Sequence, residues 1–112
     1  MGTFVKLGAY MSFERVMGLE VIDDVVYQQY REQMLPILRA FGGSFGFDFK
    51  VSYVLKSKTK APINRVFTID FPNREVMDQF FSDPTYLEVK NKYFDRSVKS
   101  VTTISMHEVV AI

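Results

Sequence analysis

The chain has 112 residues and no cysteine, and its 14 basic residues nearly balance 13 acidic ones. This length suits one domain with a single core, and the charge balance argues against a nucleic-acid or anionic-lipid partner. Without thiols the chain has no disulfide or thiolate metal site, so we expect a cytoplasmic protein. No stretch has the apolar core of a signal peptide or the length of a membrane span, so we expect no membrane partner.

The first third of the chain predicts a strand followed by a helix. Apolar residues alternate over residues 15–22, as in a strand with one buried face. Asp23 then offers an N-cap, and apolar residues recur at three- and four-residue steps up to about Ala40. Pro36 removes a hydrogen bond and predicts a bend or a tightened last turn, and Gly42-Gly43 predicts the helix end.

A long alternating segment follows and predicts the second strand. Its larger apolar side chains are Phe45, Phe47, Phe49, Val51, Tyr53 and Leu55. The polar residues 56–62 end in a proline, which suits a hairpin loop, and residues 63–71 predict the third strand.

The last third predicts a second helix, a short helical stretch and a final strand. Asn73 is the expected N-cap of the second helix. Asp83-Pro84 begins the short stretch, which extends to about Tyr93, because aspartate caps well and proline is tolerated in a first turn. Residues 98–109 are the expected fourth strand.

This order of elements, βαββαβ, predicts a single α+β domain over residues 1–112. We expect a ferredoxin-like fold, in which a four-stranded antiparallel sheet of order 4-1-3-2 carries both helices on one face. Its core comprises about residues 14–110. Residues 1–13 are not needed for this core and form either an added edge strand or a loose arm.

The sheet face without helices also requires an explanation, because all four strands carry apolar residues on both alternating sets. A symmetric homodimer that packs two such faces together is the simplest one. An aromatic platform for a planar ligand is the alternative. The candidate interface residues are Phe45, Phe47, Phe49 and Tyr53.

A series of short motifs gives the chain a resemblance to a known family. They are Asp23 followed by Tyr27 and Tyr30, Pro36 before Phe41-Gly42-Gly43, then Phe71-Pro72, and Asp83-Pro84-Thr85-Tyr86. In their order and spacing they span about residues 15–108, and they resemble the bacterial proteins filed as domain of unknown function 1330.

The resemblance implies a dimeric α/β barrel. That superfamily also holds cofactor-independent quinone-forming monooxygenases, a lactone isomerase and haem-degrading enzymes, which use a pocket between sheet and helices. The family itself has no established activity, so the resemblance leaves function open. Its members often carry an arginine about seven residues after the tyrosine that matches Tyr86, where this chain has Tyr93.

Six residues are candidates for a ligand pocket. By the resemblance, Tyr27, Tyr30 and Tyr86 line or close a pocket, with ordinary helix packing as the alternative. His107 is the only histidine and therefore the first candidate for a base, against the alternative of a plain strand residue. Glu20 and Arg65 are expected to pair, because a carboxylate in a central strand needs a cation, a proton or a wet pocket.

The sequence is compatible with two functions. The first is a dimer that binds an apolar or aromatic metabolite, and oxidises or isomerises it without a cofactor; it predicts a real pocket. The second is a non-catalytic assembly module with a filled core and no cavity above roughly 300 Å³. A lone histidine without thiols predicts no metal site, and we expect no cofactor.

Overall fold

The computed structural model describes residues 11–110. Two β-α-β units are joined by a hairpin. The elements are β1 (Met11–Val21), α2 (Asp24–Ala40), β2 (Ser44–Lys50), β3 (Arg65–Phe71), α3 (Arg74–Ser82), α4 (Pro84–Val89), the π-helical segment η1 (Lys90–Phe94), α5 (Asp95–Ser97) and β4 (Val98–Val110).

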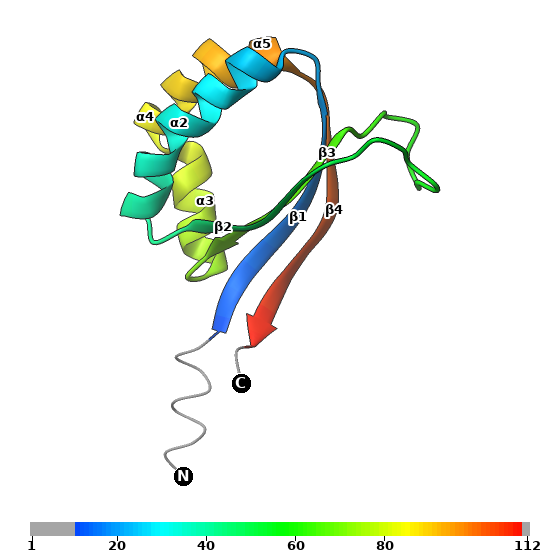
Figure 1. Cartoon of the computed structure of the whole chain (residues 1–112). Helices are drawn as coiled ribbons and strands as arrows, with labels where there is room; N and C mark the ends of the chain where they lie inside the picture. The colour runs from blue at the N-terminus through cyan, green and yellow to red at the C-terminus, as the bar shows by residue number, and fades with distance from the viewer. Residues whose placement is uncertain (1–10, 111–112) are drawn as a thin grey trace.

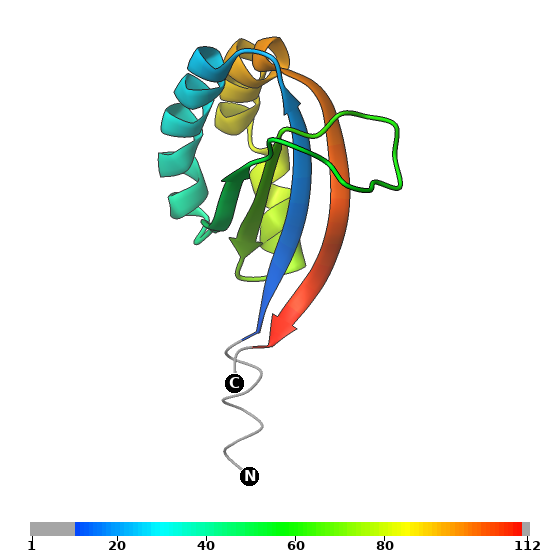
Figure 2. The ribbon, with the colours of Figure 1, turned by 45° about the vertical axis from the view of Figure 1, so that its right-hand side comes forward.

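The four strands form one antiparallel sheet of order β2-β3-β1-β4, which is the predicted order read from its other edge. The helices lie on one side of this sheet, and the loop between β2 and β3 projects on the other side (Figure 1). Figure 2 shows that the long strands β1 and β4 run side by side over their full length. The predicted ferredoxin-like α+β fold is confirmed. We call the sheet face without helices the open face.

The core lies between the sheet and the helices. Tyr27, Met34 and Leu38 of α2 and Phe80 of α3 are each at most 1% exposed. Burying a side chain of this size stabilises the fold by about 1.5–3 kcal/mol. The apolar spacing in the sequence therefore identified the buried stripe of α2 correctly.

A side chain caps the N-terminus of α2, and backbone N–H groups cap its C-terminus. The Asp23 carboxylate accepts a hydrogen bond from the Val26 N–H at 3.0 Å. At the other end the Gly42 N–H donates to the carbonyl of Arg39 and the Gly43 N–H to that of Leu38, both at 2.9 Å. Gly42 has a φ of 76°, which glycine adopts without strain.

Pro36 does not break α2, because the helix runs through it to Ala40. The final turn tightens, since the Phe41 N–H is shared between the carbonyls of Ile37 at 3.3 Å and Leu38 at 3.1 Å. The helix therefore ends before Gly43, as predicted.

A β-bulge interrupts the pairing of β2 with β3. Phe45 lies opposite Ile69 but Asp48 lies opposite Phe67, so β2 contains one extra residue between these pairs. The Phe47 N–H donates to the Thr68 hydroxyl at 2.8 Å instead of to a ladder carbonyl. Phe45 and Asp48 therefore both face the helices, and alternation then directs Phe47 and Phe49 to the open face.

The hairpin loop is longer than predicted, because β2 ends at Lys50 and not near Leu55. Beyond Lys50, one further backbone bond joins the Val51 N–H to the Asn64 carbonyl at 2.8 Å. The Asn64 side-chain amide then both accepts from the Val21 N–H and donates to the Val21 carbonyl, each at 2.8 Å. The Asn64 side chain thus makes the hydrogen bonds to Val21 that the backbone of a neighbouring strand would make. The residues between Val51 and Asn64 lie outside the sheet.

Two other boundaries differ from the prediction. The helical stretch that starts at Pro84 continues past Tyr93 to Ser97, and its middle part, η1, is π-helical. β1 begins at Met11, and Phe13 belongs to the core at 6% exposed, so the core begins before residue 14. The rest of the predicted N-terminal arm lies outside the described residues.

No helix within residues 11–110 has both the length and the apolar character that crossing a bilayer requires.

The bulge depends on Gly46. A Cβ atom at this position would lie 2.5 Å from the Thr68 Oγ1 atom that accepts the Phe47 N–H. We predict that Gly46→Ala lowers the free energy of unfolding by about 1–3 kcal/mol, because Thr68 must move. Chemical denaturation measures this change. Ser44→Ala, an exposed change in the same strand, should stay within about 0.5 kcal/mol, and an equal loss in both variants would contradict the prediction.

Candidate functional site

A cavity of about 330 Å³ lies between the helices and the sheet, and we call it the helix–sheet cavity. Most of its lining is apolar and aromatic, and includes Met34, Phe67, Ile69 and Phe94. Its polar lining residues are Arg15, Tyr27, Tyr30, Arg31, Tyr86 and Lys90. An apolar wall with few polar groups is typical of a small-molecule site.

Two buried tyrosines meet in the wall of this cavity. The hydroxyl oxygens of Tyr30 on α2 and Tyr86 on α4 are 2.8 Å apart and share a hydrogen bond. The two side chains are only 5% and 3% exposed. Burial raises the pKa of both phenols, that of Tyr30 well above its ordinary value. Both groups therefore stay protonated near neutral pH and act as hydrogen-bonding groups.

Asp48 lies between two arginines, Arg31, which lines the cavity, and Arg65, which does not. Arg65 donates from Nε at 2.7 Å and from Nη2 at 2.8 Å, and Arg31 donates to the same carboxylate at 3.3 and 3.4 Å. Burial alone would raise the pKa of Asp48, but the Arg65 hydrogen bonds and the two positive charges outweigh it and lower the pKa. Asp48 is therefore ionised at neutral pH and fixes both guanidinium groups.

Arg31 also closes the cavity beside Tyr27 and Phe45. Its Nε donates to the Tyr27 hydroxyl at 2.8 Å, and its guanidinium lies 3.9 Å from the centroid of the Phe45 ring. A cation over an aromatic face is attracted by the ring quadrupole. Phe45 is thus a wall of the helix–sheet cavity, which corrects its expected place on the open face. The bulge after it is the physical reason.

Arg15 reaches the cavity from the central strand β1. Its guanidinium lies 4.7 Å from the centroid of the Phe81 ring, and its Nε is buried without a hydrogen-bond partner within residues 11–110. Burial lowers the pKa of this group, while Tyr86 and Asp78 act in the opposite direction. The sequence indicates the position of Arg15, because in an alternating strand Arg15 lies on the same face as the buried residues Met17 and Leu19.

The expected pair of Glu20 and Arg65 does not form, and that prediction was wrong. Arg65 lies opposite Leu19, so it shares the helix-side face with Leu19, while Glu20 points to the open face. The Glu20 carboxylate accepts a hydrogen bond from the Ser100 hydroxyl at 3.1 Å. Arg65 pairs with Asp48 instead, and neither Glu20 nor Arg65 is among the residues that line the helix–sheet cavity.

His107 also lies away from this cavity, on the open face of β4. Its Nδ1 is 2.7 Å from the Ser105 hydroxyl and its Nε2 is 3.0 Å from a Glu14 oxygen. Asp70 lies nearby, and burial followed by the charge of Glu14 raises its pKa. The six candidates thus divide: the three tyrosines meet at the cavity, whereas Glu20, Arg65 and His107 do not.

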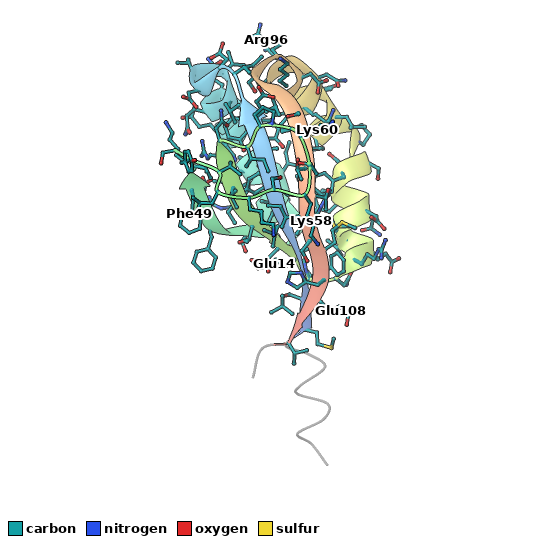
Figure 3. The ribbon with its side chains drawn as sticks, turned by 90° about the vertical axis from the view of Figure 1, so that its right-hand side faces the viewer. Glu14, Phe49, Lys58, Lys60, Arg96 and Glu108 are labelled. Atoms are coloured by element: carbon teal, nitrogen blue, oxygen red, sulfur yellow. The ribbon has the colours of Figure 1, made fainter. Side chains whose placement is uncertain are left out.

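The remaining interface candidates lie on the open side. Phe47 and Phe49 are 63% and 55% exposed and stack on each other with ring centroids 5.8 Å apart. Tyr53 belongs to the hairpin loop and is 76% exposed. Figure 3 looks onto the open face and shows this loop crossing the sheet, with Phe49 at one edge and Lys58 and Lys60 over the other part.

The loop covers a hollow of about 610 Å³ on the open face. Loop residues such as Tyr53 and Val54 line one side of it, and Val66 and Ile104 line the sheet side. This hollow is larger than the helix–sheet cavity, but none of its lining residues is buried; its polar lining residues are Lys56, Ser57, Lys58, Thr59, Thr102 and Thr103. Within residues 11–110, no cluster of three or more histidine, aspartate or glutamate residues is arranged to hold a metal ion.

The comparisons with known proteins agree with this architecture. The model of the family described as Domain of unknown function (DUF1330) matches residues 15–106. No match is found among curated proteins. A protein of unknown function from Rhodopseudomonas palustris superposes with a TM-score of 0.68 at 14% identity, covering 99% of this chain and 92% of that one.

Two further solved structures are similar. A dabb family protein with a ferredoxin-like fold from Mesorhizobium loti has a TM-score of 0.59 at 10% identity, covering 91% of this chain and 98% of that one. A nipsnap family protein of unknown function from Agrobacterium tumefaciens has a TM-score of 0.59 at 17% identity, with coverages of 91% and 90%. At these identities the likeness shows the fold alone.

The Asp48 carboxylate gives a prediction for stability and pH. Asp48→Asn should lower the free energy of unfolding by about 1–3 kcal/mol at pH 7, because two guanidinium groups lose their carboxylate. The folded pKa is below the unfolded value, so this contribution is present above about pH 4 and is lost as pH falls through the folded pKa.

Denaturation curves at pH 7 and at stepwise lower pH test this prediction. The difference between wild type and Asp48→Asn should shrink below about pH 4. Asp24→Asn is the matched control, because Asp24 is 68% exposed and its ion pair with Lys50 is long, at 3.8 Å. This substitution should change the free energy of unfolding by less than about 1 kcal/mol. A wild-type advantage that persists undiminished at the lowest pH would contradict the assignment.

Proposed function

The chain belongs to the family described as Domain of unknown function (DUF1330), and we propose that it is a homodimeric protein that binds a small apolar or aromatic molecule in the helix–sheet cavity. The observation that carries the proposal is the cavity itself. Its volume of about 330 Å³ is within the range of small-molecule sites, and a filled core would have left no such space.

The walls of the cavity suit an aromatic ligand. Phe45, Phe67 and Phe94 line it, and aromatic rings favour offset or edge-to-face contacts with another ring. The hydroxyl pair of Tyr30 and Tyr86 supplies a polar point inside the apolar wall. These features orient a bound molecule and exclude water from it.

The lining of the cavity supports ligand binding better than it supports catalysis in which a side chain transfers a proton. A general base needs a pKa near the working pH and must reach the substrate proton. The titratable groups that line the cavity are arginines, a lysine and tyrosines, and burial raises the pKa of Tyr30 and Tyr86 further. The only imidazole, His107, lies on the opposite face of the sheet.

Aromatic probes test the ligand site directly. We expect 2-naphthamide and 2-naphthoate to raise the melting temperature, because a ligand that binds only the folded state stabilises it. Val101 and Ile104 of β4 are both 51% exposed, but Val101 lines the cavity and Ile104 lines the hollow on the open face. Val101→Phe should weaken binding about tenfold by occupying the cavity, and Ile104→Phe should leave it within about threefold.

Calorimetric titration of the wild type and both variants measures these affinities. If neither probe binds the wild type, or if Ile104→Phe weakens binding as much as Val101→Phe, the helix–sheet cavity is not the ligand site.

The dimer in this proposal is formed through the open face. Phe47 and Phe49 are exposed there, and the hollow beneath the hairpin loop offers an apolar recess to a second copy. A twofold interface buries the same patch twice, so a single exposed patch suffices for both partners. Exposed apolar side chains gathered on one face are typical of such an interface.

Substitution of an exposed phenylalanine tests the dimer. We predict that wild-type protein at micromolar concentration has the mass of a dimer by light scattering, and that Phe49→Asp has the mass of a monomer, because a charge would be buried in the interface. Val25→Asp is the control, since Val25 is 73% exposed on α2 in the helix layer. A monomeric wild type, or a monomeric Val25→Asp, would contradict this interface.

A further inference from the structure

Arg15 stands out among the charged residues of the central strand. On β1 it is flanked by Ile69 of β3 and Met106 of β4, and it faces the helices. Its Nε atom is buried and has no hydrogen-bond partner within residues 11–110. A buried donor without an acceptor costs free energy, so a folded protein retains one only where something compensates for it.

The other cations that line the helix–sheet cavity already have carboxylate partners. Arg31 bonds to Asp48 at 3.3 Å, and Lys90 bonds to Asp95 at 3.0 Å. No carboxylate of residues 11–110 forms a comparable ion pair with Arg15. The charge of Asp78 acts on Arg15 from beyond ion-pair distance, so among the cations that line the cavity Arg15 is the one without an ion pair within residues 11–110.

A second donor lies close to this guanidinium. Tyr86 lies near enough to Arg15 for each to shift the pKa of the other, and both residues pack against the Phe81 ring. In the Tyr30–Tyr86 pair one hydroxyl hydrogen is used between the two oxygens, and the other hydroxyl hydrogen remains free to donate. The guanidinium and the phenol pair together form a site for an acceptor group.

We propose that the cavity selects an aromatic monocarboxylate, and that Arg15 binds its carboxylate while the aromatic wall holds its ring. This inference rests on the proposed function, that the helix–sheet cavity is a ligand site. One guanidinium presents parallel N–H donors whose geometry and single charge match one carboxylate. Because Arg31 and Lys90 already pair with carboxylates, the single charge of Arg15 matches a monocarboxylate better than a phosphate dianion.

The cost of Arg15 in the unliganded protein agrees with this role. Burial is the largest influence on its pKa and lowers it, so the fold itself disfavours the charged guanidinium. A binding residue is commonly retained at the expense of stability. A purely structural arginine would instead stabilise the protein in the absence of ligand.

A matched pair of probes separates charge recognition from cavity filling. 2-Naphthoate and 2-naphthamide have the same ring and nearly the same shape, and differ in the charge of one group. In calorimetric titrations at pH 7 we expect wild-type protein to bind the carboxylate at least about tenfold more tightly than the amide, as for a charge-assisted hydrogen bond in an apolar site.

Arg15→Met removes the guanidinium and keeps a long apolar side chain. It should weaken 2-naphthoate binding about 10- to 100-fold, leave 2-naphthamide within about threefold, and not lower the melting temperature of the unliganded protein. Arg96→Met is the control with the same change of net charge, because Arg96 is exposed on α5 at one end of the molecule (Figure 3). It should affect neither probe.

A spectroscopic measurement on wild-type protein does not depend on the folding of Arg15→Met. In protein labelled with ¹⁵N-arginine, the Arg15 Nε–H resonance is identified by its loss in Arg15→Lys. We expect it to shift and saturate with 2-naphthoate and to shift much less with 2-naphthamide. An Nε–H resonance that does not respond to bound 2-naphthoate would overturn the proposal.

The outcomes also separate this inference from the proposed function. Equal affinity for both probes, unchanged in Arg15→Met, would overturn the carboxylate site and leave the cavity as an aromatic-ligand site. If Arg15→Met binds both probes equally more weakly and has a lower melting temperature, Arg15 has a structural role and the carboxylate site is likewise overturned. If the wild type binds neither probe, both the carboxylate site and the proposed function fail.

Discussion

The β-bulge in β2 is the constraint on which both faces of this protein depend. In a regular strand Phe45, Phe47 and Phe49 would share one face, but the extra residue after Phe45 reverses the parity. Phe45 then lines the helix–sheet cavity, and Asp48 reaches Arg65 and the cavity residue Arg31. The two later phenylalanines remain on the open face. The bulge thus sets which aromatic side chains line the cavity and which are exposed on the open face, and it lies at Gly46, where a Cβ atom would lie 2.5 Å from the Thr68 hydroxyl oxygen.

Much of the fold could be predicted from the sequence, because the relevant interactions are local. The N-caps at Asp23 and Asn73 and the glycine stop after α2 act within a few residues, and each appears where the residue types indicate it. The sheet order follows from the sequence of elements and the restricted connections between them. The tyrosines of the cavity were indicated by family resemblance, and the geometry brings Tyr30 and Tyr86 into contact.

The errors came from register, which is not a local property. The predicted Glu20–Arg65 pair assumed that both side chains lie on one face, but the pairing of Arg65 with Leu19 directs Glu20 to the other side. A shift of one residue inverts every side chain of a strand, so composition cannot settle such a pair. Asp48 was missed for the same reason, because its direction depends on a bulge that the pattern of alternation conceals. Arg15 could have been found, since it interrupts the buried parity of β1.

The charges of β1 also distinguish a structural face from a binding face. On the open face Glu14 is bound by His107 and Glu20 by Ser100, so each carboxylate has a partner from the neighbouring strand β4. On the helix side the same strand carries Arg15, whose neighbours Ile69 and Met106 offer no acceptor. Desolvated charge is tolerated only when it is paired, and a pairing group that comes from outside the chain is a ligand. The arrangement of the central strand therefore favours the helix side of the sheet for the proposed ligand site.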